Sequence, residues 1–283
     1  MNTIKQFFGL LRLSHWSKGF FVFWGVIYSG SLDYLPTAIL AALAFCLIAS
    51  AGYIYNDFQD READRLHPHK HRRPLASGDA TLSFAFGTFI FLLVSGLALG
   101  WSVSSKLAAL LGVYLLINLA YSHILKNLPV FNMLCVASGY MLRVLAGTIG
   151  IGLPLAPWLA AIAILLSGLI AICKRRLEKQ LKVKHASEEG LFSGRAPYQL
   201  DFLIALLVVS CFTVYLSYIF VVRDQSFYFL LTLPFFAIGL WRFSSLATKE
   251  NSTDDPVAIF FSDSLSRFNL LCFLVLTFIA IRH

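Results

Sequence analysis

The sequence predicts an all-α polytopic membrane bundle of about nine transmembrane helices. Of the 283 residues, 58% are hydrophobic and only 13% are charged, whereas soluble domains average roughly 45–50% and 25%. The mean hydropathy of +0.73 leaves too little polar surface for a soluble domain. The apolar residues form long runs rather than the alternating pattern of a membrane β-barrel. This composition also excludes a disordered chain, a disulfide scaffold and a nucleic-acid-binding domain.

Nine apolar stretches approach the length that a bilayer requires, which is about 20 residues per helix. They run over residues 19–32, 36–57, 81–101, 105–121, 129–150, 156–173, 198–221, 226–242 and 264–281. The first is short, but no small-residue cleavage site follows it. We therefore expect a retained span there and not a signal peptide that is removed.

The positive charges predict the orientation of these spans. With the N-terminus in the cytoplasm, nineteen of the 23 Lys and Arg residues lie in cytoplasmic segments, and three lie on the opposite side. This asymmetry follows the positive-inside rule and predicts a multi-pass protein of the inner (cytoplasmic) membrane. Two long cytoplasmic loops, at about 58–80 and 174–197, hold twelve of these Lys and Arg residues. We expect one integral-membrane domain over 1–283, with its active site on the cytoplasmic face.

Acidic side chains gather where the first of these loops begins. If the helix predicted over 36–57 continues, Asn56, Asp60 and Asp64 share one face and Asp57 flanks it. Oxygen ligands without cysteine suit Mg²⁺, which is bound in proteins by a few carboxylates plus substrate phosphates. We therefore predict a Mg²⁺ site with Asn56, Asp60 and Asp64 as ligands, and we take the three aspartates as catalytic.

Basic side chains lie within and after this acidic motif. Arg61 lies within it and Arg65 follows directly, so a solvated helix end whose acids pair with these two arginines is the alternative interpretation. Lys70, Arg72 and Arg73 follow, and such cations make charge-assisted bonds to phosphate oxygens. This cationic loop is a candidate diphosphate clamp. A contact with lipid headgroups or a plain topology signal is the alternative.

The NDxxDxxxD motif at the end of the second of nine helices resembles the UbiA superfamily of intramembrane prenyltransferases. In that superfamily the motif binds Mg²⁺ and a substrate diphosphate, so the resemblance implies a UbiA-like bundle that uses Mg²⁺. Aromatic prenyltransferases of the superfamily typically carry a second acidic motif after the sixth helix. Here the corresponding stretch, from Cys173 to Lys179, is cationic instead.

With this cationic stretch in place of the second acidic motif, the sequence resembles one branch of the superfamily, the decaprenyl-phosphate phosphoribosyltransferases. The matching stretches are His15–Lys18, Asn56–Gly78, Ala120–Ser122 with Leu125–Lys126, Ser138–Gly147, Lys174–Arg175 with Glu178, and Asp255–Pro256 with Asp263. This resemblance implies that phosphoribose passes from phosphoribosyl pyrophosphate to a membrane polyprenyl phosphate. Diphosphate is released, and the product leads towards lipid-linked arabinose for cell-envelope glycans.

The same resemblance implies roles for further side chains. Lys174 and Arg175 would take a second phosphate, from donor or acceptor, and count as catalytic. Glu178 would orient Arg175 or contact ribose, unless it is only a surface partner of Lys174. Lys18 and Lys126 are further cations on the cytoplasmic face.

Three residues within or at the ends of spans are also candidate substrate ligands. Tyr121 and Tyr198 could bond phosphate or ribose hydroxyls, although tyrosines are also common in interfacial belts. Arg143 lies near the middle of a span, where a charge costs about 2.5–3.5 kcal/mol on insertion scales. We expect it to face the bundle interior and an anion; snorkelling to an interface or a structural ion pair are the alternatives.

Two other functions compete with phosphoribosyl transfer. One is transfer of a polyprenyl group from its diphosphate to an aromatic acceptor, against which the missing second acidic motif counts. The other is a transporter or binding protein, which predicts charged residues near the midplane. Only Arg143 fits that pattern. We expect no nucleic-acid partner, and a homo-oligomer is compatible with the sequence.

Overall fold

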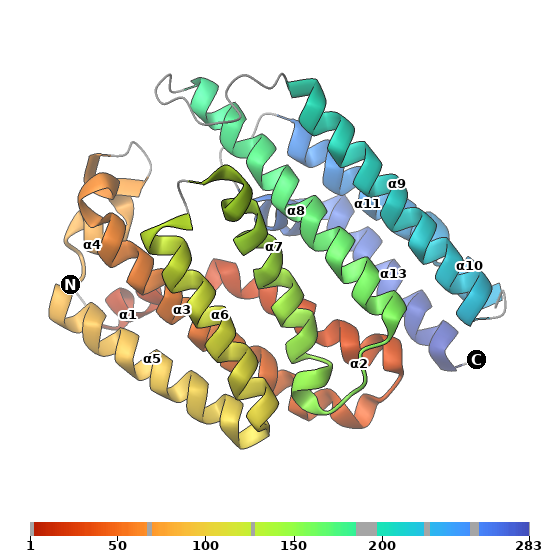
Figure 1. Ribbon diagram of the computed structural model, residues 1–283, viewed down its shortest axis with the longest axis horizontal. Helices are drawn as coiled ribbons and strands as arrows, with labels where there is room; N and C mark the ends of the chain where they lie inside the picture. The colour runs from red at the N-terminus through yellow and green to blue at the C-terminus, as the bar shows by residue number, and fades with distance from the viewer. Residues whose placement is uncertain are drawn as a thin grey trace. The chain divides into compact units, whose positions relative to one another are not determined.

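The fold was obtained as a computed structural model that describes residues 3–66, 70–125, 128–184, 197–223, 227–249 and 255–282. Within these ranges the chain forms helices and no strand, which confirms the predicted all-α class (Figure 1). The α-helices are α1 (Thr3–Leu11), α2 (Trp24–Ser29), α3 (Leu35–Leu66), α4 (Pro74–Ser77), α5 (Leu82–Val103), α6 (Ser105–His123), α7 (Pro129–Ala146), α8 (Pro157–Lys184), α9 (Pro197–Val222), α10 (Phe227–Leu230), α11 (Leu233–Thr248), α12 (Pro256–Ser262) and α13 (Ser264–Arg282). The 3₁₀ helices are η1 (Leu13–Phe23), η2 (Leu32–Tyr34), η3 (Lys70–Arg72) and η5 (Ile149–Ile151).

Eight helical segments in the described ranges are long and apolar enough to cross a membrane. This is roughly consistent with the predicted count of about nine. The difference lies at 19–32, where the chain forms the end of η1 and the six-residue α2 in place of one continuous span. Trp16 Nε1 donates to Ser50 Oγ at 3.1 Å, and Ser50 Oγ donates to the Leu11 carbonyl at 2.7 Å. These bonds tie η1 to the side of α3.

Two compact units make up the chain. Unit 1 comprises Met1–Val26, Asp33–Leu128 and Leu142–Pro154, and unit 2 comprises Ile27–Leu32, Pro129–Met141 and Leu155–His283. In unit 1, α3 packs against α5, α6 and η1, and Figure 1 shows α3, α5 and α6 side by side. Small residues on α3 let its neighbours approach closely, as is common between membrane helices. They include Ala38, Ala41, Ala44, Ala49 and Ala51, all buried.

In unit 1, the backbone of η1 and α2 lies directly against the end of α7. A Cβ on Gly147 would overlap the carbonyl oxygen of Val22, and one on Gly25 would overlap the carbonyl oxygen of Gly147. The lack of a side chain at both glycines therefore allows these two backbones to touch. The same contact holds Gly147, the residue that caps the C-terminal end of α7 and lies four positions after Arg143.

Unit 2 is built on α8, α9, α11 and α13. Its core includes Leu169, Cys173, Cys211 and Leu240, and Figure 1 shows α8 and α9 running along each other. An ion pair fastens α11 to the start of α13: Arg242 donates from Nε and Nη2 to Asp263 at 3.0 and 2.7 Å. Asp263 also accepts from the backbone N–H and the hydroxyl of Ser266. These donors hold the pKa of the Asp263 carboxyl well below its ordinary value.

We expect Gly147→Ala to destabilise the protein, because the added methyl group has no space beside the Val22 carbonyl. Overpacking of this kind costs about 3 kcal/mol and should appear as a lower melting temperature of the purified protein in detergent. Gly87→Ala in α5 is the matched control, since its Cβ would meet no atom within 4 Å. That variant should melt at or above the wild-type temperature. Equal melting of the two variants would contradict the packing argument.

Candidate functional site

The acidic motif lies on the last three turns of α3. The helix continues to Leu66, beyond the apolar stretch, so Asn56, Asp60 and Asp64 do share one face as predicted. Asp57 and Asp64 are buried, with 2% and 4% of their surface exposed, whereas Asn56 and Asp60 are half-buried. Buried carboxylates require partners, because an unpaired charge is expensive to remove from water. The surrounding arginines supply them.

Arg73 bridges two of these carboxylates. Its Nη1 lies 2.6 Å from Asp64 Oδ2 and 3.2 Å from Asp57 Oδ1. Arg73 precedes the short helix α4, and Leu75 anchors that helix in the core of unit 1, where it is 1% exposed. Arg61 Nε also donates to the Leu75 carbonyl at 3.3 Å. The cationic loop is thus fastened against the acidic motif. Asp57 and Asp64 are buried, whereas the exposed Glu62 pairs with Arg61 and Arg65, as the alternative interpretation of a solvated helix end expects.

Arg12 is a third member of this cluster, and sequence reasoning counted it only as a topology charge. Its guanidinium donates to Asp57 from the junction between α1 and η1. It also lies 5.3 Å from the ring centroid of Tyr53. The backbone of Arg12 is left-handed, with φ 51° and ψ 54°, the only such non-glycine residue among those described. Non-glycine residues held in this conformation cluster at functional sites. The 45 residues between Arg12 and Asp57 hid the contact from any local pattern.

Other predicted cations of unit 1 lie around this cluster. Lys18 lies in η1 with its Nζ 3.4 Å from His15 Nδ1, and the His15 ring lies 5.0 Å from the Tyr53 ring. Lys70 and Arg72 lie in η3 and are exposed. Lys126, a predicted ligand, lies outside the described residues.

Polar contacts also join α3 to α6 beside the motif. The side chain of Asn56 is hydrogen-bonded to Ser122. One position earlier on α3 and one later on α6, Tyr55 Oη is hydrogen-bonded to His123 Nε2. Tyr121, which was predicted to bind substrate, precedes Ser122 on α6 and is half-buried. Ser122 belongs to the matching stretch Ala120–Ser122, but sequence reasoning gave it no role of its own, because a lone serine carries no signal without its partner.

Arg143 faces the interior of unit 1 and does not snorkel to an interface. It is 5% exposed, and its Cζ lies 4.6 Å from the Phe45 ring centroid and 5.3 Å from that of Tyr114. Cation–π contacts of this kind are strongest where water is absent. Phe45 precedes Asn56 by eleven residues on α3, or about 16 Å along the helix axis. Arg143 therefore lies much deeper than the acidic motif.

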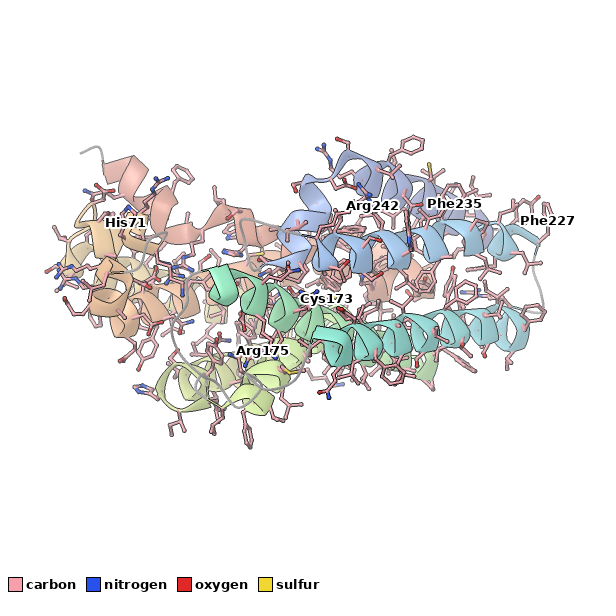
Figure 2. All side chains as sticks on the ribbon, turned by 90° about the horizontal axis from the view of Figure 1, so that it is seen from above. His71, Cys173, Arg175, Phe227, Phe235 and Arg242 are labelled. Carbon is pink, nitrogen blue, oxygen red and sulfur yellow. The ribbon has the colours of Figure 1, made fainter. Side chains whose placement is uncertain are left out.

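In unit 2, the cationic end of α8 is organised by one carboxylate. Glu178 lies 3.8 Å from Lys174 Nζ and 3.3 Å from Arg175 Nη1. Figure 2 shows Arg175 on α8, near the fully buried Cys173. A neighbouring pair, Arg176 with Asp201 at 2.9 Å, ties α8 to α9. The backbone of Tyr198 begins α9, but its side chain lies outside the described part of the chain.

The acidic motif has the donor chemistry of a Mg²⁺ site but not a complete ligand set of its own. Among the described residues, no three His, Cys, Asp or Glu side chains are grouped so as to hold a metal ion. Asn56, Asp60 and Asp64 nevertheless place one amide and two carboxylates on a single helix face. Mg²⁺ is commonly bound by one or two carboxylates together with substrate phosphates. These residues therefore fit a metal that arrives with a phosphorylated substrate.

Comparison with known proteins places this geometry in context. The model of the UbiA prenyltransferase family matches residues 19–265. The decaprenyl-phosphate phosphoribosyltransferase of Mycolicibacterium smegmatis is 33% identical over 187 residues, which are 64% of this chain and 59% of that protein. The enzyme of the same name from Corynebacterium glutamicum is 37% identical over 141 residues, or 49% of this chain and 42% of that protein. The chain thus spans about half the length of these curated relatives.

A solved structure has the same fold. A UbiA homolog from Archaeoglobus fulgidus, bound to DMAPP and Mg²⁺, superposes with a TM-score of 0.71 and 18% sequence identity. The superposition covers 98% of this chain and 99% of that one. The likeness therefore extends over the whole helical architecture.

We expect Arg73→Ala to destabilise the protein, because it leaves Asp64 buried without its 2.6 Å partner. Breaking a buried pair on one side costs about 3 kcal/mol, which thermal unfolding in detergent can measure. Arg65→Ala is the control, since the pair that Arg65 forms with Glu62 is largely exposed and contributes less than about 1 kcal/mol. An equal loss of unfolding free energy in the two variants would contradict a stabilising role for the ion pair of Arg73 with Asp64.

Proposed function

Because the chain belongs to the UbiA prenyltransferase family, we propose that it transfers the 5-phosphoribosyl group of phosphoribosyl pyrophosphate to a polyprenyl phosphate, releasing diphosphate. The chain is a multi-pass membrane protein. The observation that carries the proposal is the end of α8, where Lys174 and Arg175 are held by Glu178. The names of the two bacterial relatives support the same reaction.

The chemistry at the end of α8 favours a phosphorylated sugar over a second metal. A second metal ion would need several carboxylates there. The cluster instead contains two cations, Lys174 and Arg175, and one carboxylate, Glu178. Lys and Arg bind phosphate through charge-assisted hydrogen bonds, and Arg does so with a planar fork. Phosphoribosyl pyrophosphate carries a phosphate at C5 besides its diphosphate at C1, and the polyprenyl acceptor carries another. Lys174 and Arg175 bind one of these groups.

The acidic motif of unit 1 binds the diphosphate of the donor through Mg²⁺. Asn56, Asp60 and Asp64 would hold the ion together with the diphosphate. When bound, Mg²⁺ supplies electrostatic stabilisation of the charge that builds up on the leaving diphosphate. Magnesium bound to the Archaeoglobus fulgidus homolog supports this assignment.

The arginines of unit 1 act beside the metal. Asp57 holds Arg12 and Arg73 in place, so both guanidinium groups are pre-organised before substrate binds. Such fixed donors stabilise developing negative charge without the cost of reorientation. Lys70 and Arg72 are exposed nearby in sequence and add charge for the incoming anion. Lys18, Tyr121, Lys126, Arg143 and Tyr198 remain proposed substrate ligands.

The acceptor needs no general base from the protein. A polyprenyl phosphate is already an anion, and its oxygen attacks C1 of the ribose as the bond from C1 to diphosphate breaks. The isoprenoid tail keeps the acceptor in the bilayer, while the donor is water-soluble. The charge distribution supports an inner-membrane location, with the N-terminus and the acidic motif in the cytoplasm. The product leads towards lipid-linked arabinose for cell-envelope glycans.

A transfer assay tests this function. Purified protein is incubated with Mg²⁺, labelled phosphoribosyl pyrophosphate and polyprenyl phosphates of several lengths, including decaprenyl phosphate, and lipids are then extracted. Label should enter the lipid phase only when Mg²⁺ is present. If folded protein transfers none, and instead moves a polyprenyl group from its diphosphate to an aromatic acceptor, the prenyltransferase alternative is correct.

We expect Asp60→Asn to reduce transfer by about 100-fold, because it removes a charged ligand of the metal that stabilises the leaving group. Initial rates at saturating substrate, measured over a Mg²⁺ series, provide the test. Asp79→Asn is the matched control, since Asp79 is an exposed aspartate in the turn after α4. It should leave the rate unchanged. Wild-type rates for Asp60→Asn would exclude Asp60 as a ligand.

We expect Lys174→Ala to raise the KM for a phosphorylated substrate, the donor or the polyprenyl phosphate, by about tenfold, the loss of one charge-assisted hydrogen bond. The KM for each substrate is measured separately, so the result also shows which phosphate Lys174 contacts. Lys106→Ala, at the start of α6, is the control and should change neither value. Two unchanged KM values in Lys174→Ala would remove this residue from the site.

A further inference from the structure

Tyr53 of α3 contacts the N-terminal segment at two points, although it belongs neither to the acidic motif nor to the predicted substrate ligands. The Cζ atom of Arg12 lies 5.3 Å from the centroid of the Tyr53 ring, within the distance at which an aromatic face attracts a cation. The centroid of the His15 ring lies 5.0 Å from the same point. The backbone N–H of His15 donates to the Arg12 carbonyl at 2.9 Å, so both contacts fall on one turn of the chain.

The stripe of α3 that carries Tyr53 leads directly into the acidic motif. Residues at intervals of three and four lie on one face of a helix. Five residues of α3 follow this spacing: Ser50, Tyr53, Asp57, Asp60 and Asp64. Trp16 donates to the first of them and Arg12 to the third. The N-terminal segment is thus attached to α3 on both sides of Tyr53.

Arg12 is held by two contacts that restrict it in different ways. Its Nη2 donates to Asp57, which fixes the position of one N–H group. The ring of Tyr53 lies beside the guanidinium and restricts rotation about that bond. A guanidinium presents five N–H donors in a planar fork, so it can bond a carboxylate and a phosphate oxygen at once. The plane of the fork decides where the second partner can lie.

The backbone of Arg12 is consistent with a placement that its contacts impose. Its φ of 51° and ψ of 54° are left-handed values, which are costly for a residue with a Cβ. Such a conformation persists where the surroundings over-determine it. The contacts with Tyr53 and Asp57 are part of those surroundings.

We infer that Tyr53 is a positioning residue that orients the guanidinium group of Arg12 towards a diphosphate bound at the acidic motif. Asp57 supplies the charge that attracts Arg12, and the ring fixes the plane of the fork. An aliphatic side chain in place of the ring would keep the ion pair but leave the guanidinium free to turn. A diphosphate would then have to order Arg12 as it binds, and its affinity would fall.

This inference deepens the proposed function and rests on the binding of a diphosphate at the acidic motif. It assigns a role to a residue that lies before the motif and contacts it only through Arg12. A tyrosine with a purely structural role would affect diphosphate binding to the same extent whether or not Arg12 is present. A positioning residue affects it only while Arg12 is there to be oriented.

The test measures diphosphate binding directly. Inorganic diphosphate is titrated into the purified full-length protein in the presence of Mg²⁺ and followed by isothermal titration calorimetry. Tyr53→Leu should weaken binding by about fivefold, the cost of ordering one long side chain. Tyr53→Phe keeps the ring and should bind diphosphate as the wild type does. Tyr53→Met also lacks the ring and replaces Tyr53→Leu if that variant does not fold.

Tyr55→Leu is the control for a general loosening of α3. Tyr55 is half-buried like Tyr53, but its hydroxyl is bonded to His123 of α6 and not to the N-terminal segment. Diphosphate affinity should therefore be unchanged. An equal loss in Tyr55→Leu would overturn the inference, and so would equal affinities in Tyr53→Leu and Tyr53→Phe.

A double-mutant cycle with Arg12→Gln tests whether Tyr53 acts through Arg12. Glutamine keeps an N–H donor for Asp57 and removes the charged fork that the ring orients. In this background Tyr53→Leu should cause no further loss of affinity, because contacting residues that act as one unit are not additive. A further fivefold loss would overturn the inference, as would an absence of diphosphate binding to folded wild-type protein.

The transfer assay on the same preparations separates this inference from the proposed function. Phosphoribosyl transfer by the wild type, together with equal diphosphate affinities in all variants, would overturn the inference alone. The expected pattern of diphosphate affinities in a folded protein that transfers no phosphoribose would overturn the function alone.

Discussion

The buried charge of Asp57 is the constraint on which the acidic end of unit 1 depends. A carboxylate that is 2% exposed must be compensated, and Arg12 and Arg73 do so from two separate segments. The N-terminal segment and the loop after α3 are therefore both fastened to α3 at one point. That single anion fixes two guanidinium groups beside Asp64, which Arg73 also contacts. The burial of this charge therefore positions both guanidinium groups beside the acidic motif.

The length of α3 is the second condition. The helix begins within the apolar stretch and continues nine residues past residue 57 to Leu66, because residues 58–66 contain strong helix formers such as Gln59, Glu62 and Ala63. This continuation places Asn56, Asp60 and Asp64 in line. Its neighbour α6 then meets the motif through Ser122. A helix that stopped at the membrane boundary would have left these oxygens without a common face.

Arg143 shows how aromatic rings surround a charge in an apolar interior. The faces of Phe45 and Tyr114 lie against its guanidinium, and the two rings are themselves 4.7 Å apart. Ring quadrupoles attract a desolvated cation. In unit 2, half-buried arginines pair with carboxylates instead: Arg242 donates two hydrogen bonds to Asp263, and Arg176 pairs with Asp201. In both units the basic side chains are held in place before any ligand binds.

The sequence by itself determined the helical membrane class, the positions of the eight long apolar helices and the chemical type of the acidic motif. These are local properties, since apolar run length and the spacing of Asn56, Asp60 and Asp64 are readable along the chain. Only the tertiary structure decided that 19–32 is not one continuous span, and that Arg12 and Ser122 belong beside the motif. Both contacts cross 45 residues or more, and no periodic pattern encodes a pairing between separate helices.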